Sequence, residues 1–272
     1  YADQAAFGSA LVNRSYDQLF LLDQMAAMSA GNGFLKGMVD ADNTALIGYS
    51  MGGYGAVITA GGGVTQGAAD APFAPFGTLG VHVAGTDTHN ALPDPRIKTA
   101  VAFAPWGLTY GVWDGAGLAG VQIPMLFVAG SADDVSGYSP GVRNIWEGSV
   151  NVDRSLLTFE NANHNAAAPM PAPAESYNVD EGGLAPYDHY SDAVWDTVRM
   201  NNITQHFVTA WLGKYLGGDR AMDAYLTLTP NANDGVWATN EDGTFKDEHS
   251  HWAGFQNRKA KGLRFEVLPA AE

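Results

Sequence analysis

Four short apolar runs, each closed by glycine or by polar residues, recur along the first 160 positions of the chain. They span residues 44–47, 99–103, 123–129 and 156–159. Runs of this length without polar alternation are typical of strands that are buried on both faces of a parallel sheet. The pattern therefore predicts an α/β protein with a mostly parallel sheet and helices on both faces.

Between these runs the apolar residues change to a helical spacing. Helices are predicted over residues 14–28, from residue 51 to the glycines at 61–63, and over about residues 140–147. A longer helix near residue 200 carries apolar side chains at steps of four residues and stops at a glycine pair. Its apolar positions are Ile203, Phe207, Trp211 and Tyr215.

Three stretches show no clear period. Residues 61–95 are rich in Gly, Ala and Pro and predict an irregular insertion or a lid. Residues 165–190 form a Pro-rich loop, and residues 228–272 a polar C-terminal extension in which 263–269 adds an edge strand. We interpret residues 1–272 as a single domain.

Charge and composition exclude several classes of function. The net charge is −15, which repels nucleic acid and anionic membranes and favours neutral or cationic substrates. No apolar run approaches the roughly 18 residues of a membrane-spanning helix. The chain has no cysteine and therefore no thiol nucleophile or disulfide. With no glycine-rich phosphate loop or dinucleotide motif, no cofactor is predicted.

The cellular location of the protein stays undecided from the sequence, with the periplasm or secretion favoured.

The pattern G-x-S-x-G, in which a serine can become a nucleophile, occurs twice, at residues 48–52 and 137–141. The first follows an apolar strand and precedes a helix, which is the setting of a nucleophile elbow around Ser50. The backbone N–H of the next residue, Met51, then points toward a developing oxyanion. At the second match Ser139 precedes Pro140, which has no N–H. Ser50 is therefore the predicted nucleophile.

A serine nucleophile needs a general base and an acid that orients it. Asp133 and Asp134 directly follow the strand 123–129, and His164 lies shortly after the strand 156–159. Because the carboxyl ends of parallel strands meet at one edge of a sheet, these side chains are expected near Ser50. Asp133 is preferred over Asp134 as the acid, and His164 is the predicted base.

The other histidines fit this role less well. They are His82, His89, His189, His206, His249 and His251. His249 and His251 form an H-x-H pair in a polar segment, but no third ligand is evident. A surface pair is therefore predicted there, and no metal site is assigned.

Four motifs together carry a resemblance to a known family. GYSMGG at 48–53, APWG at 104–107, IPMLFVAGSADD at 123–134 and NANH at 161–164 resemble one branch of the α/β-hydrolase superfamily. That branch contains dienelactone hydrolases, esterases similar to platelet-activating-factor acetylhydrolase, and polyester-degrading cutinases. The match runs from about residue 14 to residue 216.

The resemblance implies the α/β-hydrolase fold and a serine esterase that uses Ser50, Asp133 and His164. The cutinase-like members carry a Pro-Trp pair, which Trp106 matches, so Trp106 is expected to line the acyl or aromatic pocket; a core tryptophan is the alternative. Tyr49, beside the nucleophile, is also expected to bind substrate. An amidase or peptidase with the same triad, or a binding subunit with an idle triad, stays open.

The chain departs from that family before the elbow. Several strands precede the serine turn in the family, whereas here only one predicted helix does. The loop that normally donates the second oxyanion N–H is missing with them. An unpaired strand next to the elbow exposes its hydrogen-bonding groups. We therefore expect an N-terminal companion segment or chain to complete the sheet.

Overall fold

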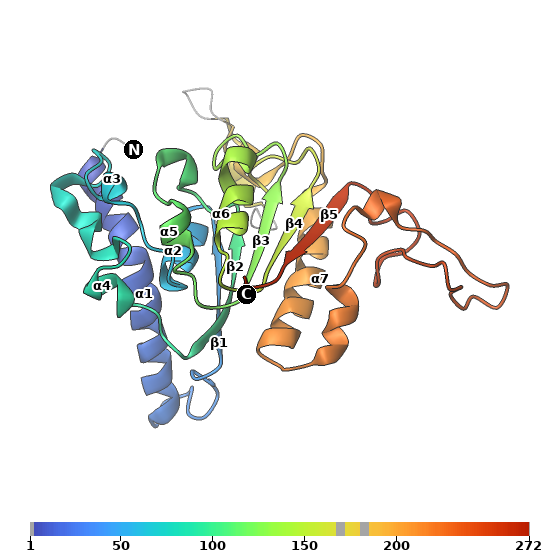
Figure 1. Ribbon diagram of the computed structural model, residues 1–272, viewed down its shortest axis with the longest axis horizontal. Coiled ribbons are helices and arrows are strands. Elements are labelled where there is room, and N and C mark those ends of the chain that lie inside the picture. The colour runs from blue at the N-terminus through green and yellow to red at the C-terminus, as the bar shows by residue number, and fades with distance from the viewer. Residues whose placement is uncertain (1–2, 167–171, 180–184, 272) are drawn as a thin grey trace.

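A five-stranded sheet forms the centre of the protein (Figure 1). The computed structural model describes residues 3–166, 172–179 and 185–271. The strands are β1 (Thr44–Tyr49), β2 (Ile97–Phe103), β3 (Met125–Gly130), β4 (Arg154–Phe159) and β5 (Leu263–Leu268). They lie in the order β1-β2-β3-β4-β5, with the first four parallel and β5 antiparallel to β4. The prediction of an α/β protein with a mostly parallel sheet is confirmed.

Helices and short helical turns connect the strands. The α-helices are α1 (Gln4–Ala30), α2 (Met51–Thr59), α3 (Gln66–Ala69), α4 (Asp87–Asn90), α5 (Gly115–Leu118), α6 (Arg143–Gly148) and α7 (Thr197–Tyr215). The shorter turns are η1 (Pro75–His82), η2 (Leu108–Tyr110), η3 (Tyr138–Val142), η4 (Ala174–Tyr177), η5 (Pro186–Tyr190), η6 (Arg220–Tyr225) and η7 (Ala232–Asp234). Within the described residues, none of these helices combines the length and apolar character needed to cross a membrane.

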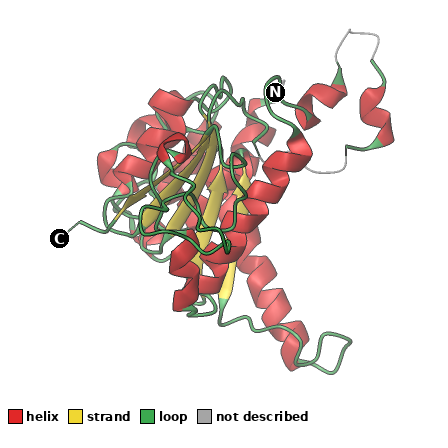
Figure 2. Cartoon of the chain, turned by 90° about the vertical axis from the view of Figure 1, so that its right-hand side faces the viewer, coloured by secondary structure: helices red, strands yellow, loops and turns green. Residues whose placement is uncertain are grey.

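The central strands bury both of their faces, as the continuous apolar runs predict. In β2, Ala100 and Ala102 pack toward the layer that contains α1, α2 and α6. The intervening residues Val101 and Phe103 pack toward α7 on the opposite face. Figure 2 shows the strands as a layer between helices. This alternation gives the protein two separate apolar cores, one on each side of the sheet.

Two predicted helices differ in their bounds from the observed ones. The N-terminal helix begins ten residues earlier than residue 14, because the Asp3 side chain accepts from the N–H groups of Ala5 and Ala6 and caps it. The helix predicted over 140–147 begins only at Arg143. Pro140 is extended and Gly141 has a φ of 151°, so neither has helical geometry.

The insertion at residues 61–95 is built from short helical turns and packs against α1. Leu79 and His82 in this stretch are fully buried. The Nε2 atom of His82 lies 3.0 Å from the carbonyl oxygen of Val12 in α1. The predicted insertion or lid therefore contributes to the core over these residues.

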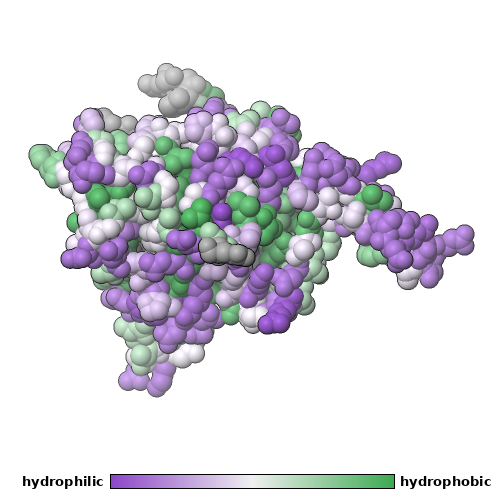
Figure 3. Space-filling model, in the orientation of Figure 1, coloured by the Kyte–Doolittle hydropathy of each residue, from purple (hydrophilic) through white to green (hydrophobic). Residues whose placement is uncertain are grey.

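The C-terminal extension leaves the body of the protein and returns to it as β5. The stretch before β5 projects beyond the sheet (Figure 1), and its surface is largely hydrophilic (Figure 3). β5 then pairs with β4 through Phe265 opposite Leu157 and Leu263 opposite Phe159. The edge strand predicted at residues 263–269 is present at Leu263–Leu268.

β1 forms the other edge of the sheet. Within the described residues its only strand partner is β2. The N–H of Ser50 donates to Phe103 of β2, so alternate backbone groups, including those of Ala45 and Ile47, point away from β2. The Ile47 side chain is 58% exposed. Among the described residues, the outer side of β1 therefore presents backbone groups without a strand partner, beside an apolar side chain.

Candidate active site

Ser50 occupies a tight turn between β1 and α2. Its backbone has φ 55° and ψ −113°, a conformation outside the usual regions for a residue with a side chain. A Cβ at Gly48 would lie 2.1 Å from the carbonyl oxygen of Gly52, so the turn requires glycine there. The carbonyl of Ser50 accepts from the N–H groups of Tyr54 and Trp106. These contacts hold the strained turn that projects the serine side chain.

The three predicted side chains Ser50, His164 and Asp133 lie in one hydrogen-bonded series. The Nε2 atom of His164 is 3.0 Å from Ser50 Oγ. Its Nδ1 atom is 2.9 Å from Asp133 Oδ2 and 3.1 Å from Oδ1. An ionised carboxylate can only accept, so Nδ1 carries the ring proton and Nε2 is left to accept from the serine hydroxyl. This is the arrangement in which an imidazole can remove a proton from an alcohol.

Asp133, rather than Asp134, holds the ring. The side chain of Asp133 is fully buried. Its Oδ1 atom accepts from the backbone N–H groups of Val135 and Ser136, both at 2.9 Å, which orients the carboxylate toward the histidine. Asp134 is exposed, and only its backbone N–H reaches the histidine loop, at 3.4 Å from Asn163 Oδ1. These positions favour Asp133 over Asp134 as the carboxylate that orients His164.

The loops that carry Asp133 and His164 meet closely because β3 ends at a glycine. A Cβ at Gly130 would lie 2.2 Å from the carbonyl oxygen of Ala162. The N–H of Ala132 donates to that same carbonyl at 2.9 Å. The loop after β4 is fixed further by a bond from the N–H of Asn163 to Asp192 Oδ2 at 2.7 Å. Only a residue without a side chain lets the two loops approach this closely.

Tyr49 contacts the base from the strand side. Its ring lies 5.2 Å from the His164 ring. Its hydroxyl donates to Asn165 Oδ1 at 3.1 Å. Burial, with a smaller contribution from the charge of Asp133, raises the pKa of Tyr49 to about 12, so its hydroxyl stays protonated and remains a donor. Tyr49, predicted to bind substrate, is thus also placed to orient the histidine.

Asn165 was not singled out from the sequence. Its Nδ2 atom donates to the carbonyl oxygens of Asp188 and Ser191, at 2.5 Å and 2.8 Å. Together with the bond from Tyr49, these contacts join β1, the histidine loop and the end of the Pro-rich loop. Of that loop, residues 167–171 and 180–184 lie outside the described residues. From the sequence, only its position directly after His164 could have suggested a role for Asn165.

The two remaining predicted site residues lie next to the elbow. Trp106 is only 8% exposed, and its ring contacts those of Phe7, Phe73 and Tyr54. This places most of Trp106 in the core, the alternative considered for it. Met51 is the first residue of α2 and directly follows Ser50.

Ser139 and His251 make their described hydrogen bonds outside this series. The Ser139 hydroxyl lies 3.5 Å from Asn144 Oδ1. The prediction of an exposed H-x-H pair is wrong for His251, which is 6% exposed. Its Nε2 lies 3.0 Å from the carbonyl oxygen of Gln256, and its ring packs on Trp237. Within the described ranges, no group of three His, Asp or Glu side chains is placed to hold a metal ion.

No protein family matches this chain in a family scan, and no curated protein matches it in a search. The fold defines an α/β protein with a mostly parallel sheet flanked by helices. The chemistry of the site is therefore considered from its own geometry.

Proposed function

We propose that this protein is a serine hydrolase of the α/β-hydrolase type that cleaves carboxylic esters through an acyl-enzyme. The observation that carries the proposal is the continuous series from Ser50 Oγ through His164 to Asp133, with contacts of 3.0 Å and 2.9 Å. The strained turn at Ser50 adds support, because such backbone strain is concentrated at functional positions.

The first half of the proposed reaction forms the acyl-enzyme. His164 Nε2 takes the hydroxyl proton as Ser50 Oγ attacks the ester carbonyl carbon. The bond between that carbon and the leaving oxygen then breaks, and His164 returns the proton to the leaving alcohol. Asp133 stays ionised, keeps the ring oriented and stabilises the imidazolium.

The second half releases the acid. A water molecule attacks the acyl carbon while His164 takes one of its protons. The bond to Ser50 Oγ breaks, and the serine recovers its proton from the ring. The Met51 N–H, at the N-terminal end of α2, is the proposed donor to the oxyanion in both halves.

We also propose that a further β-strand, from a companion segment or chain, pairs with the outer side of β1. The unpaired backbone groups and the exposed Ile47 support this proposal. A strand there would place a loop beside Ser50 that can supply a second oxyanion donor. Hydrogen exchange measured on active protein tests it: the Ile47 amide should be protected. Rapid exchange of that amide in fully active protein would contradict the companion strand.

Substitution of the nucleophile tests the hydrolase. Ser50→Ala should lower kcat on short-chain p-nitrophenyl esters by about 10⁴-fold or more, since the triad acts as a unit. Ser139→Ala is the matched control, because it changes the serine of the other G-x-S-x-G match. It should leave kcat unchanged. Equal activity of both variants and the parent would refute the proposal.

Active-site labelling separates chemistry from substrate choice. A fluorophosphonate probe should modify Ser50 alone, as read by mass spectrometry of peptides. A panel of matched esters, amides and peptides should show turnover of the esters. Turnover of amides or peptides alone would replace the esterase with an amidase, and failure to label Ser50 would favour a binding subunit.

A further inference from the structure

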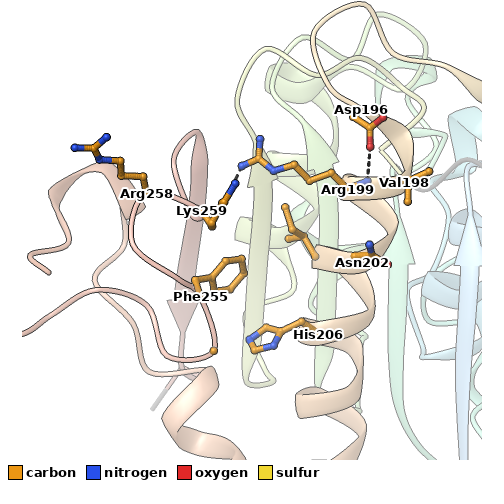
Figure 4. Close-up of a pocket in the computed structure, with 10 residues that line it drawn as sticks. Asp196, Val198, Arg199, Asn202, His206, Phe255, Arg258 and Lys259 are labelled. Atoms are coloured by element: carbon orange, nitrogen blue, oxygen red, sulfur yellow. Dashed lines mark hydrogen bonds between the residues drawn. The ribbon is translucent and has the colours of Figure 1, made fainter. Parts of the chain in front are cut away.

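A cavity of about 700 Å³ lies beside α7, on the side that faces the C-terminal extension (Figure 4). One wall is the N-terminal half of α7, and the other is the loop at residues 254–259. The residues that line it do not include Ser50, Asp133 or His164. The cavity is therefore distinct from the proposed active site.

Cationic side chains gather at this cavity although the whole chain has a net charge of −15. Arg199 comes from α7, and Arg258 and Lys259 come from the loop. Within the described residues, no ion pair neutralises any of the three. Elsewhere cationic side chains do pair with carboxylates, as at Arg96, Arg143, Lys214 and Arg264. The cavity thus carries positive charge that forms no ion pair with the part of the chain that the structure describes.

One acidic residue, Asp196, lies at the rim of the cavity and reduces its positive charge. Asp196 lines the cavity, and its Oδ1 atom accepts from the Arg199 N–H at 2.7 Å as the cap of α7. Arg199 and Lys259 lie on the same side of the loop as this carboxylate, whereas the Arg258 side chain extends away from α7 (Figure 4). A ligand with one negative charge matches this excess, whereas a long polyanion would meet repulsion from the acidic remainder of the surface.

The arginine is held in place before any ligand binds. Its guanidinium lies 4.7 Å from the centre of the Trp195 ring. Its Nη2 donates to the carbonyl oxygen of Lys259 at 3.0 Å, which joins the loop to the helix. An arginine that is already ordered loses less conformational freedom on binding an anion.

The deeper part of the cavity is apolar and aromatic. Ile203 is 6% exposed, and Phe255 and His206 pack edge to face at 5.1 Å (Figure 4). Gly254 has a φ of 83°, and a Cβ there would lie 2.4 Å from the His206 ring, so this wall requires glycine. Burial lowers the pKa of His206, which keeps the ring neutral at pH 7. An apolar group can therefore enter below the cationic rim.

We infer that this cavity binds a small organic carboxylate with a ring-sized apolar body. The carboxylate contacts Arg199 and Lys259, because a guanidinium matches the two oxygens of a carboxylate. The apolar body lies on Phe255 and Ile203. The size of the cavity agrees with such a ligand, since pockets for small molecules measure about 300–1,000 Å³. This inference does not depend on the hydrolase proposal.

Calorimetric titration with 2-naphthoate tests the site. We expect saturable binding with a Kd of about 1 mM or below at low ionic strength. Binding should weaken as salt is added, because the contact is between charges. The neutral analogue 2-naphthalenemethanol, which keeps the ring and lacks the charge, should bind at least about tenfold more weakly.

Two substitutions and one control locate the binding. Arg199→Gln and Lys259→Gln should each raise the Kd, with Arg199→Gln raising it by about tenfold or more. Arg220→Gln removes an exposed cation beyond the far end of α7 and should leave the Kd unchanged. The inference fails if naphthoate does not bind, if the neutral analogue binds equally well, or if all three variants bind like the parent. Circular dichroism of each variant checks that the fold is retained.

Discussion

At the scale of single residues, Asn165 connects the proposed base to its surroundings. It accepts from the hydroxyl of Tyr49 and donates to the carbonyls of Asp188 and Ser191. The neighbouring His164 is thereby fixed between β1 and the end of the Pro-rich loop. Because the proposed proton transfer depends on the orientation of the ring, we expect these bonds to affect it although Asn165 does not contact the reacting atoms.

Removing the Asn165 side chain should slow the proposed reaction. Asn165→Ala loses three hydrogen bonds at the histidine loop, and we expect kcat to fall by about tenfold or more. Tyr49→Phe keeps the ring contact and loses one bond, so its effect should be smaller. Steady-state kinetics with a pH profile of kcat/KM measures both. Asn178→Ala, at an exposed position of the same loop, is the control and should match the parent.

At the scale of elements, Arg154 joins β4 to α6 and to the chain beyond β5. The side chain is buried, and its Nε donates to the carbonyl of Trp146 at 2.7 Å. Its Nη1 donates to the carbonyls of Pro269 at 2.8 Å and Val152 at 3.2 Å. Burial lowers the pKa of Arg154. A buried cation is held here by carbonyl oxygens instead of a carboxylate.

Replacing this arginine should destabilise the whole domain. Arg154→Met keeps much of the side-chain volume but leaves several buried carbonyls without a donor, at a cost of about 3 kcal/mol in the free energy of unfolding. Urea denaturation followed by circular dichroism measures this loss. Arg220→Met changes an exposed arginine and should alter stability by less than about 0.5 kcal/mol. A neutral effect of Arg154→Met would show that its carbonyl contacts contribute little.

At the scale of the whole molecule, buried histidines link stability to pH. His82, which belongs to the insertion, is fully buried against α1, and Val12 O accepts a hydrogen bond from its Nε2. Its Nδ1 is buried without a partner within the described residues. Burial lowers the pKa of His82 below its ordinary value of 6.5, despite the opposing contact with Val12. His206 shifts in the same direction for the same reason.

Acid should therefore destabilise the fold. When the folded-state pKa is the lower one, the unfolded chain binds more protons, so stability present above pH 6.5 decreases as the pH falls below that value. One histidine contributes a slope of at most about 1.4 kcal/mol per pH unit. His82→Gln should reduce the loss of stability between about pH 7.5 and pH 5.5, measured by urea denaturation. His189→Gln, at an exposed position, is the control and should keep the slope of the parent.

The sequence predicted secondary-structure elements best where a run of apolar residues is closed by a glycine. The apolar runs that end in glycine located β1 and β3, because each run is a continuous apolar segment of strand length closed by a glycine. The beginning of α6 was predicted too early, since Pro140 and Gly141 are compatible with several backbone conformations. Their actual conformation depends on contacts between distant segments.

The proximity of Ser50, Asp133 and His164 was predictable, because their order along the chain and their places after strands follow from the topology of a parallel sheet. What the sequence alone determined is thus the α/β class and the three side chains that meet at one edge of the sheet. The tertiary structure decided the choice of Asp133 over Asp134, the role of Asn165, the burial of Trp106 and the cationic cavity beside α7. Each of these depends on atoms that are far apart in the chain, and only packing sets the distances between them.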